Sequence, residues 1–408
     1  MAVGLNAFPE IPEIKGVRFA AVEAGIKKAN KKDLVVFELS EGSSVAGVFT
    51  QNQFCAAPVR VCREHLASDT TTPRYLVINT GNANAGTGKS GYEKAITTCE
   101  AVASQVGVQK HQVLPFSTGV IGEPLPVDKI LAALPNALSS LKSIGWKDAG
   151  LGIMTTDTLP KGAFRQVEVF GKIVTIGGIS KGAGMIRPNM ATMLGYIFTD
   201  AAVDQKVLAS LLKSTTNQSF NRITIDSDTS TNDSCIAVAT GLAENESISD
   251  LSCGDGLVFA EAFLAVMQEL AHAIVRDGEG ATKFVTVEVT GAAQVNDATK
   301  TAFEIAHSPL VKTALFASDP NWGRILAVVG RAGVEDLQVD KVSININGCE
   351  IVKNGGRSSD YTEEAGQVAM APSEIHILVD LGAGDCSDTV WTTDFSHDYV
   401  TINAEYRT

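Results

Sequence analysis

A short glycine-rich run contains a lysine and a serine in the order that nucleotide-binding loops use. Residues 83–90 read ANAGTGKS, which fits the relaxed phosphate-loop pattern of Gly or Ala, four residues, then Gly-Lys-Ser. The run follows the apolar stretch 75–79 and precedes the helix-like stretch 92–107, which is the context that such a loop requires. Asp380, at the end of the apolar run IHILVD, could hold the magnesium ion. The alternative is a turn between a strand and a helix, because the Gly and Asn residues of this run favour turns.

The stretch KGAGMIRPNMATMLGYIFTDA (181–201) could carry a different chemistry. A Pro-Asn pair predicts a turn, so Thr192 is expected at the start of a strand, just after a bend. In one interpretation Thr192 is an ordinary β-branched strand residue. In the other, backbone strain lets the Thr192 hydroxyl attack the carbonyl of Ala191, and an N→O acyl shift followed by hydrolysis cuts the chain. The new N-terminal threonine would carry a nucleophile and a base together, since an α-amino group has a pKa of roughly 7.7–8.0.

These residues must be positioned by an alternation of short strands and amphipathic helices. The predicted strands are 33–39, 75–79, 166–170, 172–179, 193–199, 283–289, 341–346 and 374–381. The clearest predicted helices are 92–107, 127–141, 205–220 and 255–275. The strands at 166–179 are close enough for a hairpin, which favours mixed sheets over one parallel sheet. We place a domain boundary at DGEGAT (277–282), where a long helix ends in glycine and a β-rich part begins.

The composition limits the function classes. The 408 residues, 45% of them apolar and 19% charged, are enough for two or three packed units. A net charge of −13 argues against a nucleic-acid groove or an anionic membrane surface. The seven cysteines form no CxxC pair and the six histidines no HExxH motif, so neither a disulfide scaffold nor a zinc site is predicted. Without a signal-like segment or an apolar run of ~20 residues, the expected compartment is the cytoplasm.

Several longer blocks together resemble the ornithine acetyltransferase family, and the resemblance covers nearly the whole chain. The blocks are AGVFTQNQFCAAPV (46–59), NTGNANA (79–85), STGVIGEPLP (117–126), TTDTLPK (155–161), residues 181–201, SFNRITIDSDTSTND (219–233), DGEGATKF (277–284) and DPNWGRILAVVGRAG (319–333). One departure is Ala183, where serine is more usual; it leaves the neighbouring lysine and threonine unchanged. Because NTGNANA belongs to the family pattern and the family binds no ATP, the resemblance implies that 83–90 is not a phosphate loop.

The resemblance implies a fold and an assembly. The family is similar in fold to self-processing N-terminal-nucleophile amidases, so we expect an α/β (α+β) fold of layered mixed sheets and helices, with a β-rich α/β C-terminal domain. Self-cleavage between Ala191 and Thr192 would release residues 1–191 as an α chain. Residues 192–282 would begin the β chain and complete the catalytic domain, and 283–408 would form the C-terminal domain, with a tail that reaches the active site. Two α and two β chains would form a heterotetramer.

The activity that the resemblance implies is acyl transfer in arginine biosynthesis. N-acetylornithine would donate its acetyl group to glutamate by a ping-pong mechanism through acetyl-Thr192, which gives ornithine and N-acetylglutamate. Bifunctional members also use acetyl-CoA as a donor substrate. No metal or other cofactor is expected, and the expected partners are these small molecules, not nucleic acid or a membrane. The alternative is an N-terminal-nucleophile aminopeptidase or amidase, which would release acyl groups to water.

The family's functional positions map onto residues of this sequence. Thr192 is the nucleophile, and the oxyanion donors are the Thr118 hydroxyl and the Gly119 backbone N–H. The substrate-binding positions are Thr155, Lys181, Thr192, Glu279, Asn403 and Thr408. Lys181 offers a positive charge and Glu279 a negative one, which suits amino-acid substrates that carry an α-carboxylate and, in one case, a side-chain ammonium.

The residues alone leave other interpretations open. Lys181 could be a solvated turn lysine, Glu279 a surface charge at a helix end, and residues 118–119 a plain loop after the strand-like VLPF (113–116). Asp157, Asp319 and Arg324 lie in the blocks but receive no role.

Overall fold

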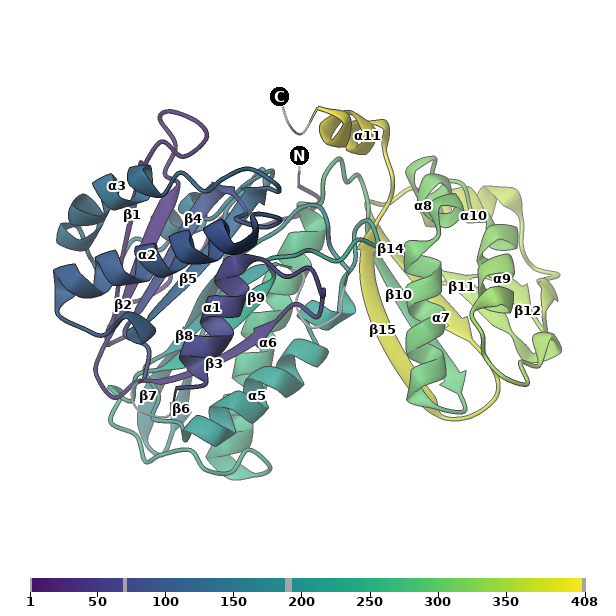
Figure 1. Ribbon diagram of the computed structural model, residues 1–408. Helices are drawn as coiled ribbons and strands as arrows, with labels where there is room; N and C mark the ends of the chain where they lie inside the picture. Colours follow the sequence, from purple (N-terminus) through teal and green to yellow (C-terminus); the bar gives the residue numbers. More distant parts are fainter. Residues whose placement is uncertain (1, 69–71, 188–192, 406–408) are drawn as a thin grey trace.

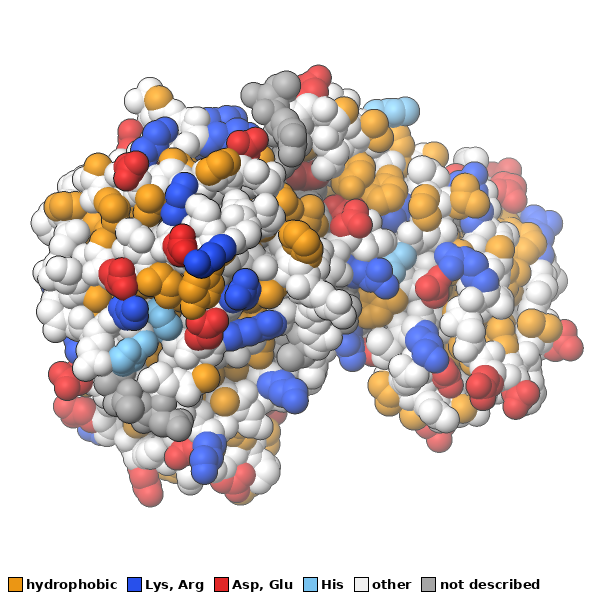
Figure 2. Space-filling model, in the orientation of Figure 1, with side chains coloured by type: hydrophobic (Ala, Val, Ile, Leu, Met, Phe, Trp, Pro, Cys, Tyr) orange, Lys and Arg blue, Asp and Glu red, His pale blue; other side chains and the backbone are white. Residues whose placement is uncertain are grey.

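Three β-sheets organise the chain in a computed structural model that describes residues 2–68, 72–187 and 193–405. Two of them lie in an N-terminal lobe and the third in a C-terminal lobe (Figure 1). The two lobes meet at a narrow waist, and acidic and basic side chains are interspersed over the face that Figure 2 shows.

The N-terminal lobe contains a four-stranded and a five-stranded sheet. The first has the order β1-β2-β4-β5, and only β4 and β5 run parallel in it. The second has the order β3-β9-β8-β7-β6, and only β8 and β9 run parallel. The strands are β1 (Val17–Val22), β2 (Leu34–Leu39), β3 (Ser44–Phe49), β4 (Tyr75–Asn82), β5 (Val113–Val120), β6 (Lys161–Val169), β7 (Lys172–Lys181), β8 (Leu194–Thr199) and β9 (Ser234–Ala239).

The two sheets pack face to face on an aromatic core. The ring of Phe37 in β2 lies 4.8 Å from that of Phe198 in β8, and Trp146 lies 4.6 Å from Phe19, measured between centroids. Helices cover both outer faces, so the lobe has four layers in the order α-β-β-α. The helices are α1 (Ala57–Leu66), α2 (Gly88–Val106), α3 (Val127–Ser139), α4 (Lys147–Gly152), α5 (Gln205–Asn217) and α6 (Gly254–Arg276), with short 3-10 turns η1 (Lys110–Gln112) and η2 (Phe220–Arg222).

Helix α6 is, by length and composition, apolar enough to cross a membrane. It packs instead against the five-stranded sheet, where Phe259, Phe263 and Leu270 are fully buried. Its apolar character is therefore that of a core helix.

The C-terminal lobe is built on a six-stranded mixed sheet of order β13-β12-β11-β14-β10-β15. Its strands are β10 (Phe284–Ala292), β11 (Ser343–Ile346), β12 (Cys349–Lys353), β13 (Gly356–Arg357), β14 (Glu374–Asp380) and β15 (Cys386–Thr393). Its helices are α7 (Val295–His307), α8 (Pro309–Phe316), α9 (Trp322–Arg331), α10 (Glu363–Met370) and the 3-10 turn η3 (Val339–Lys341). The last helix, α11 (His397–Ala404), leaves this lobe and lies above the junction of the two lobes (Figure 1).

The layered mixed sheets confirm the predicted fold class. The hairpin predicted at 166–179 is present as β6 and β7, which are joined by Phe170 and Gly171, both with positive φ. Each of the eight predicted strands has a counterpart. The prediction missed β5 beyond residue 116, strands β1, β3, β9, β12, β13 and β15, helices α1 and α4, and the helices that follow α6.

Candidate active site

One cavity gathers six of the residues that the sequence singles out, from five separate segments. It is lined by Thr118 and Gly119 at the end of β5, Thr155 before β6, Lys181 at the end of β7, Glu279 after α6 and Asn403 in α11. Ala191, Thr192 and Thr408 lie outside the described residues. The chain is described again from Met193, and Leu194 pairs with Lys181 across β7 and β8.

Gly119 occupies a position that only glycine can fill. Its φ is +136°, and a Cβ there would lie 2.3 Å from the carbonyl carbon of Gly81 and 2.5 Å from the backbone nitrogen of Asn82. Gly81 is its register partner in the parallel pair of β4 and β5. The close approach of these two backbones sets the direction of the peptide groups that line the cavity.

The NTGNANA block is a buried hydrogen-bond network that holds the ends of β4 and β5 together. The Ser117 hydroxyl donates to Asn79 Oδ1 (2.6 Å), and Asn79 Nδ2 donates to the Asn82 carbonyl (2.9 Å). Asn84, with φ of +47°, donates through Nδ2 to the Gly91 carbonyl at the start of α2 (2.9 Å). The asparagines therefore shape the strand ends beside Thr118.

This geometry does not support a phosphate loop at 83–90. The Lys89 side chain is 90% exposed and pairs with Glu93 on the surface of α2, with Nζ 3.5 Å from Oε1. Asp380 ends β14 in the C-terminal sheet, whereas residues 83–90 follow β4 in the N-terminal lobe. The lysine of the pattern, in helix α2, and its acidic residue, in strand β14, thus belong to different lobes.

Lys181 fixes the orientation of the Thr118 hydroxyl. Its Nζ donates to Thr118 Oγ1 at 3.1 Å. An ammonium group can only donate, so the Thr118 hydroxyl proton is directed elsewhere and stays available for an acceptor. Burial lowers the pKa of Lys181, while nearby carboxylates, led by Asp157 and Asp233, oppose that shift. Lys181 is therefore not the solvated turn lysine of the alternative interpretation.

A buried ion cluster supports the Thr155 loop and the end of β7. Lys161 Nζ lies 2.6 Å from Asp157 Oδ1 and 2.7 Å from Asp277 Oδ2, and all three side chains are at most 1% exposed. Asp157 also accepts from the backbone nitrogens of Thr155 (2.9 Å) and Gly182 (2.8 Å). Burial by itself raises the pKa of Asp157, but Lys161 and Lys181 outweigh it and hold the pKa well below its usual range.

Glu279 is a buried acid that lines the same cavity, not a surface charge at a helix end. It is 7% exposed, its backbone nitrogen donates to the Ala183 carbonyl (2.8 Å), and Asn403 Nδ2 donates to its Oε2 (2.8 Å). A Cβ on Gly184 would lie 2.4 Å from Glu279 Oε2, so the glycine makes room for this carboxylate. Helix α11 is held beside it, because the Ser396 hydroxyl donates to the Gly280 carbonyl at 2.6 Å.

Sequence reasoning missed several residues that build the site. Asn232 Nδ2 donates to the carbonyls of Ala83 (2.5 Å) and Ser117 (2.8 Å) and so ties β5 to the start of β9. Asp157, in TTDTLPK, received no role, and neither Lys161 nor Asp277 was singled out although both lie in the quoted blocks. A second cavity, lined by lysines of the β1–β2 loop, adjoins the first. The lysine-rich run IKKANKKD (26–33) was its only sequence signal.

A comparison with known protein families identifies the family of this chain. The profile of the ArgJ family matches residues 18–408. The chain belongs to the ArgJ family.

Relatives within the ArgJ family match over their full lengths. The arginine biosynthesis bifunctional protein ArgJ of Pseudomonas syringae pv. tomato is 57% identical over 411 residues, and that of Pseudomonas fluorescens is 54% identical, with 100% of each chain covered in both cases. Among solved structures, the arginine biosynthesis bifunctional protein argJ from Bacillus halodurans is 41% identical and has a TM-score of 0.50. That match covers 52% of this chain and 99% of the Bacillus chain. ArgJ family membership confirms the resemblance drawn from the sequence blocks.

Proposed function

We propose that this chain is an acetyltransferase of arginine biosynthesis that moves the acetyl group of N-acetylornithine to glutamate. Membership of the ArgJ family and 54–57% identity to two bifunctional proteins of arginine biosynthesis support this class of activity. The observation that carries the site assignment is the gathering of Thr118, Gly119, Thr155, Lys181, Glu279 and Asn403 around one cavity.

The proposed reaction has two balanced steps. In the first, the Thr192 hydroxyl oxygen bonds to the acetyl carbon, the carbon–nitrogen bond breaks, and the hydroxyl proton passes to the departing amine of ornithine. In the second, the neutral α-amine of glutamate attacks the acetyl-threonine ester, the bond to Thr192 Oγ breaks, and an amine proton returns to that oxygen. The α-amino group of a free Thr192 would relay the proton in both steps.

The described residues fit the other needs of this reaction. The Thr118 hydroxyl and the Gly119 backbone N–H would stabilise the oxyanion of each tetrahedral intermediate, and such donors are commonly worth about 3–4 kcal/mol each. Lys181 would attract the substrate α-carboxylate, and Glu279 would face the side-chain ammonium of ornithine. Thr155, Asn403 and Thr408 would fix orientation by hydrogen bonds. Thr192 is joined through Met193 alone to Leu194, which pairs with Lys181, so the nucleophile would be within chain reach of the cavity.

Self-cleavage between Ala191 and Thr192 would expose this nucleophile as a chain terminus. It would give an α chain of residues 1–191 and a β chain of residues 192–408, and the β chain is just over half of the 408 residues. The Bacillus chain, matched over 99% of its own length, spans 52% of this chain, so it is about as long as the proposed β chain. We propose that two α and two β chains assemble in the cytoplasm, with no cofactor and with acetyl-CoA as a second donor.

The mass of the purified protein tests the cleavage, and trapping tests the intermediate. We expect two chains from the wild type and one intact chain from Thr192→Ala, because the variant lacks the attacking hydroxyl. N-acetylornithine without glutamate should add one acetyl group to the β chain, and double-reciprocal plots for donor and acceptor should be parallel. A fully active wild type that remains uncut would refute the nucleophile. Acetate as the main product in the presence of glutamate would favour the amidase alternative.

A further inference from the structure

A second cavity, the lysine cavity, opens off the candidate active site. It has a volume of about 180 Å³ and shares Gly119, Val120, Thr155 and Thr156 with the first cavity. Its other walls come from the β1–β2 loop, the end of β4 and helix α11. They are lined by Lys27, Lys28, Lys31, Asp33, Thr80, Gly81, Ile402 and Glu405.

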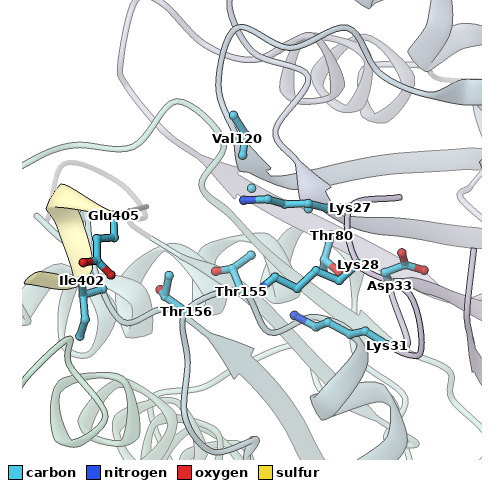
Figure 3. Close-up of a pocket in the computed structure, with 12 residues that line it drawn as sticks. Lys27, Lys28, Lys31, Asp33, Thr80, Val120, Thr155, Thr156, Ile402 and Glu405 are labelled. Atoms are coloured by element: carbon cyan, nitrogen blue, oxygen red, sulfur yellow. The ribbon is translucent and has the colours of Figure 1, made fainter. Parts of the chain in front are cut away.

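The side chains of the three lysines extend into the lysine cavity. In Figure 3 the side chains of Lys28 and Lys31 extend toward Thr155 and Thr156, and Lys27 runs in the same direction nearer to Val120. Lys31 Nζ donates to the Met154 carbonyl at 2.8 Å, which uses one of its three protons. Burial lowers the pKa of Lys31; the negative charge of Asp157 opposes that shift, and the positive charge of Lys28 adds to it. In a chain of net charge −13, this is a local concentration of positive charge beside the acyl-transfer site.

The cavity also contains an unused hydrogen-bonding group. Thr80 is 1% exposed, and its Oγ1 has no hydrogen-bond partner among the described residues. A buried hydroxyl without a partner is costly, and a ligand oxygen would relieve that cost. The cavity also has two acidic residues, Asp33 and Glu405. Asp33 accepts from the backbone nitrogens of Ala24 and Ile26 at 2.6 Å each, and Glu405 is exposed at the end of α11.

The two connected cavities therefore differ in charge: the first has one lysine and one acid, Lys181 and Glu279, whereas the second has three lysines beside Asp33 and Glu405. Glu279 lines only the first cavity, and the three lysines line only the second. A side-chain ammonium suits the Glu279 end. A side-chain carboxylate there would meet a buried negative charge, whereas in the lysine cavity it would meet ammonium groups and a free hydroxyl.

We propose that the lysine cavity binds the side-chain carboxylate of the acyl acceptor glutamate, through Lys28, Lys31 and the Thr80 hydroxyl. The proposal rests on the proposed acetyl transfer and adds to it that the two substrates place their side chains at opposite ends of one continuous cavity. The acetyl group is then exchanged at the shared residues between the two ends, Gly119 and Thr155.

The test compares Lys28→Met, Lys31→Met and the double variant with the matched control Lys32→Met. Lys32 belongs to the same loop but pairs with Asp148 (2.6 Å) and does not line the cavity. Four rates are measured: acetyl transfer from N-acetylornithine to glutamate, the same transfer to glutamine, acetyl transfer from acetyl-CoA to glutamate, and exchange of labelled ornithine into N-acetylornithine without glutamate. Glutamine has nearly the shape of glutamate without its side-chain charge, and the exchange needs no anionic side chain.

We expect the double variant to raise KM for glutamate by about tenfold or more, because each charge-assisted contact is worth on the order of one such factor. The preference for glutamate over glutamine should fall by a similar factor, and exchange should change far less than transfer. Lys28 is exposed, so Lys28→Met alone carries the test if Lys31→Met does not fold.

Two results would overturn the lysine cavity as the carboxylate site. The first is a KM for glutamate and a glutamate-to-glutamine preference equal to those of Lys32→Met. The second is an effect confined to transfer from acetyl-CoA, which would assign the lysines to the phosphates of that donor. A wild type without exchange or transfer would overturn the proposed function itself, and the lysine proposal with it.

Discussion

At the scale of single residues, the backbone contact at Gly119 makes the oxyanion geometry testable. Gly119→Ala would drive a Cβ into the backbone of Gly81 and Asn82, so β5 must move away from β4. We predict a loss of acetyl transfer of at least about a hundredfold, the size of effect seen when one oxyanion donor is removed. The measurement is kcat/KM for transfer to glutamate.

The control for this variant is Gly88→Ala. Gly88 also has positive φ (+59°), but its Cβ would meet nothing within 4 Å. We expect this control to cost about 1 kcal/mol of stability and to keep its activity. Equal activity in the two variants would contradict the role given to the β4–β5 contact.

The buried cation Lys161 gives a second prediction at this scale. Lys161→Met removes the buried cation that contacts both Asp157 and Asp277, so we predict a destabilisation of about 3–5 kcal/mol. Thermal unfolding followed by tryptophan fluorescence measures it. Lys142→Met removes a partly exposed partner of Asp148 and should cost less than about 1 kcal/mol. A Tm for Lys161→Met equal to that of this control would show that the cluster contributes little.

At the scale of elements, the sequence predicted the strands and helices whose apolar residues recur with a clear strand or helix period. The hairpin β6–β7 and helix α6 follow from periodicity, and both are found. Only VLPF (113–116) of strand β5 was recognised as strand-like, because Gly119 in the Ser-Thr-Gly that follows is unfavourable in most strands. The structure tolerates Pro115 because β5 is an edge strand of its sheet. The lysine cavity could not be predicted from local pattern, since it joins the β1–β2 loop to residues of β4, β5 and α11.

Helix α11 gives a prediction for the C-terminal element. Deleting residues 403–408 removes the Asn403 contact with Glu279 but keeps Ser396, which anchors the helix to Gly280. We therefore predict normal cleavage at Ala191–Thr192, and strongly reduced acetyl transfer mainly through a higher KM for N-acetylornithine. Mass analysis and initial rates measure the two effects separately. Asn403→Ala should reproduce part of the KM effect, and a truncated enzyme with normal KM and rate would show that the tail is dispensable.

At the scale of the whole molecule, the proposed cleavage point divides the chain but not the fold. Strands β3, β6 and β7 precede residue 192, whereas β8 and β9 follow it, and all five form one sheet. Strand β7 pairs with β8 from Ile176 and Thr199 to Lys181 and Leu194, and β3 pairs with β9. The core between the two N-terminal sheets likewise joins Phe37 to Tyr196 and Phe198, across the cut.

We therefore predict that the cleaved α and β chains stay together as one cooperative unit. They should co-elute in native size-exclusion chromatography and separate only in denaturant, because parting them would break two strand pairings, β3 with β9 and β7 with β8, and expose most of two hydrophobic cores. The uncut Thr192→Ala chain is the control. Its Tm should lie within a few degrees of the cleaved enzyme, since the same strand pairs and cores form in both. If the α and β chains separate in native buffer, the prediction that they share one sheet is wrong. If the Tm of the cleaved enzyme differs from that of uncut Thr192→Ala by much more than a few degrees, cleavage changes the packing of the core.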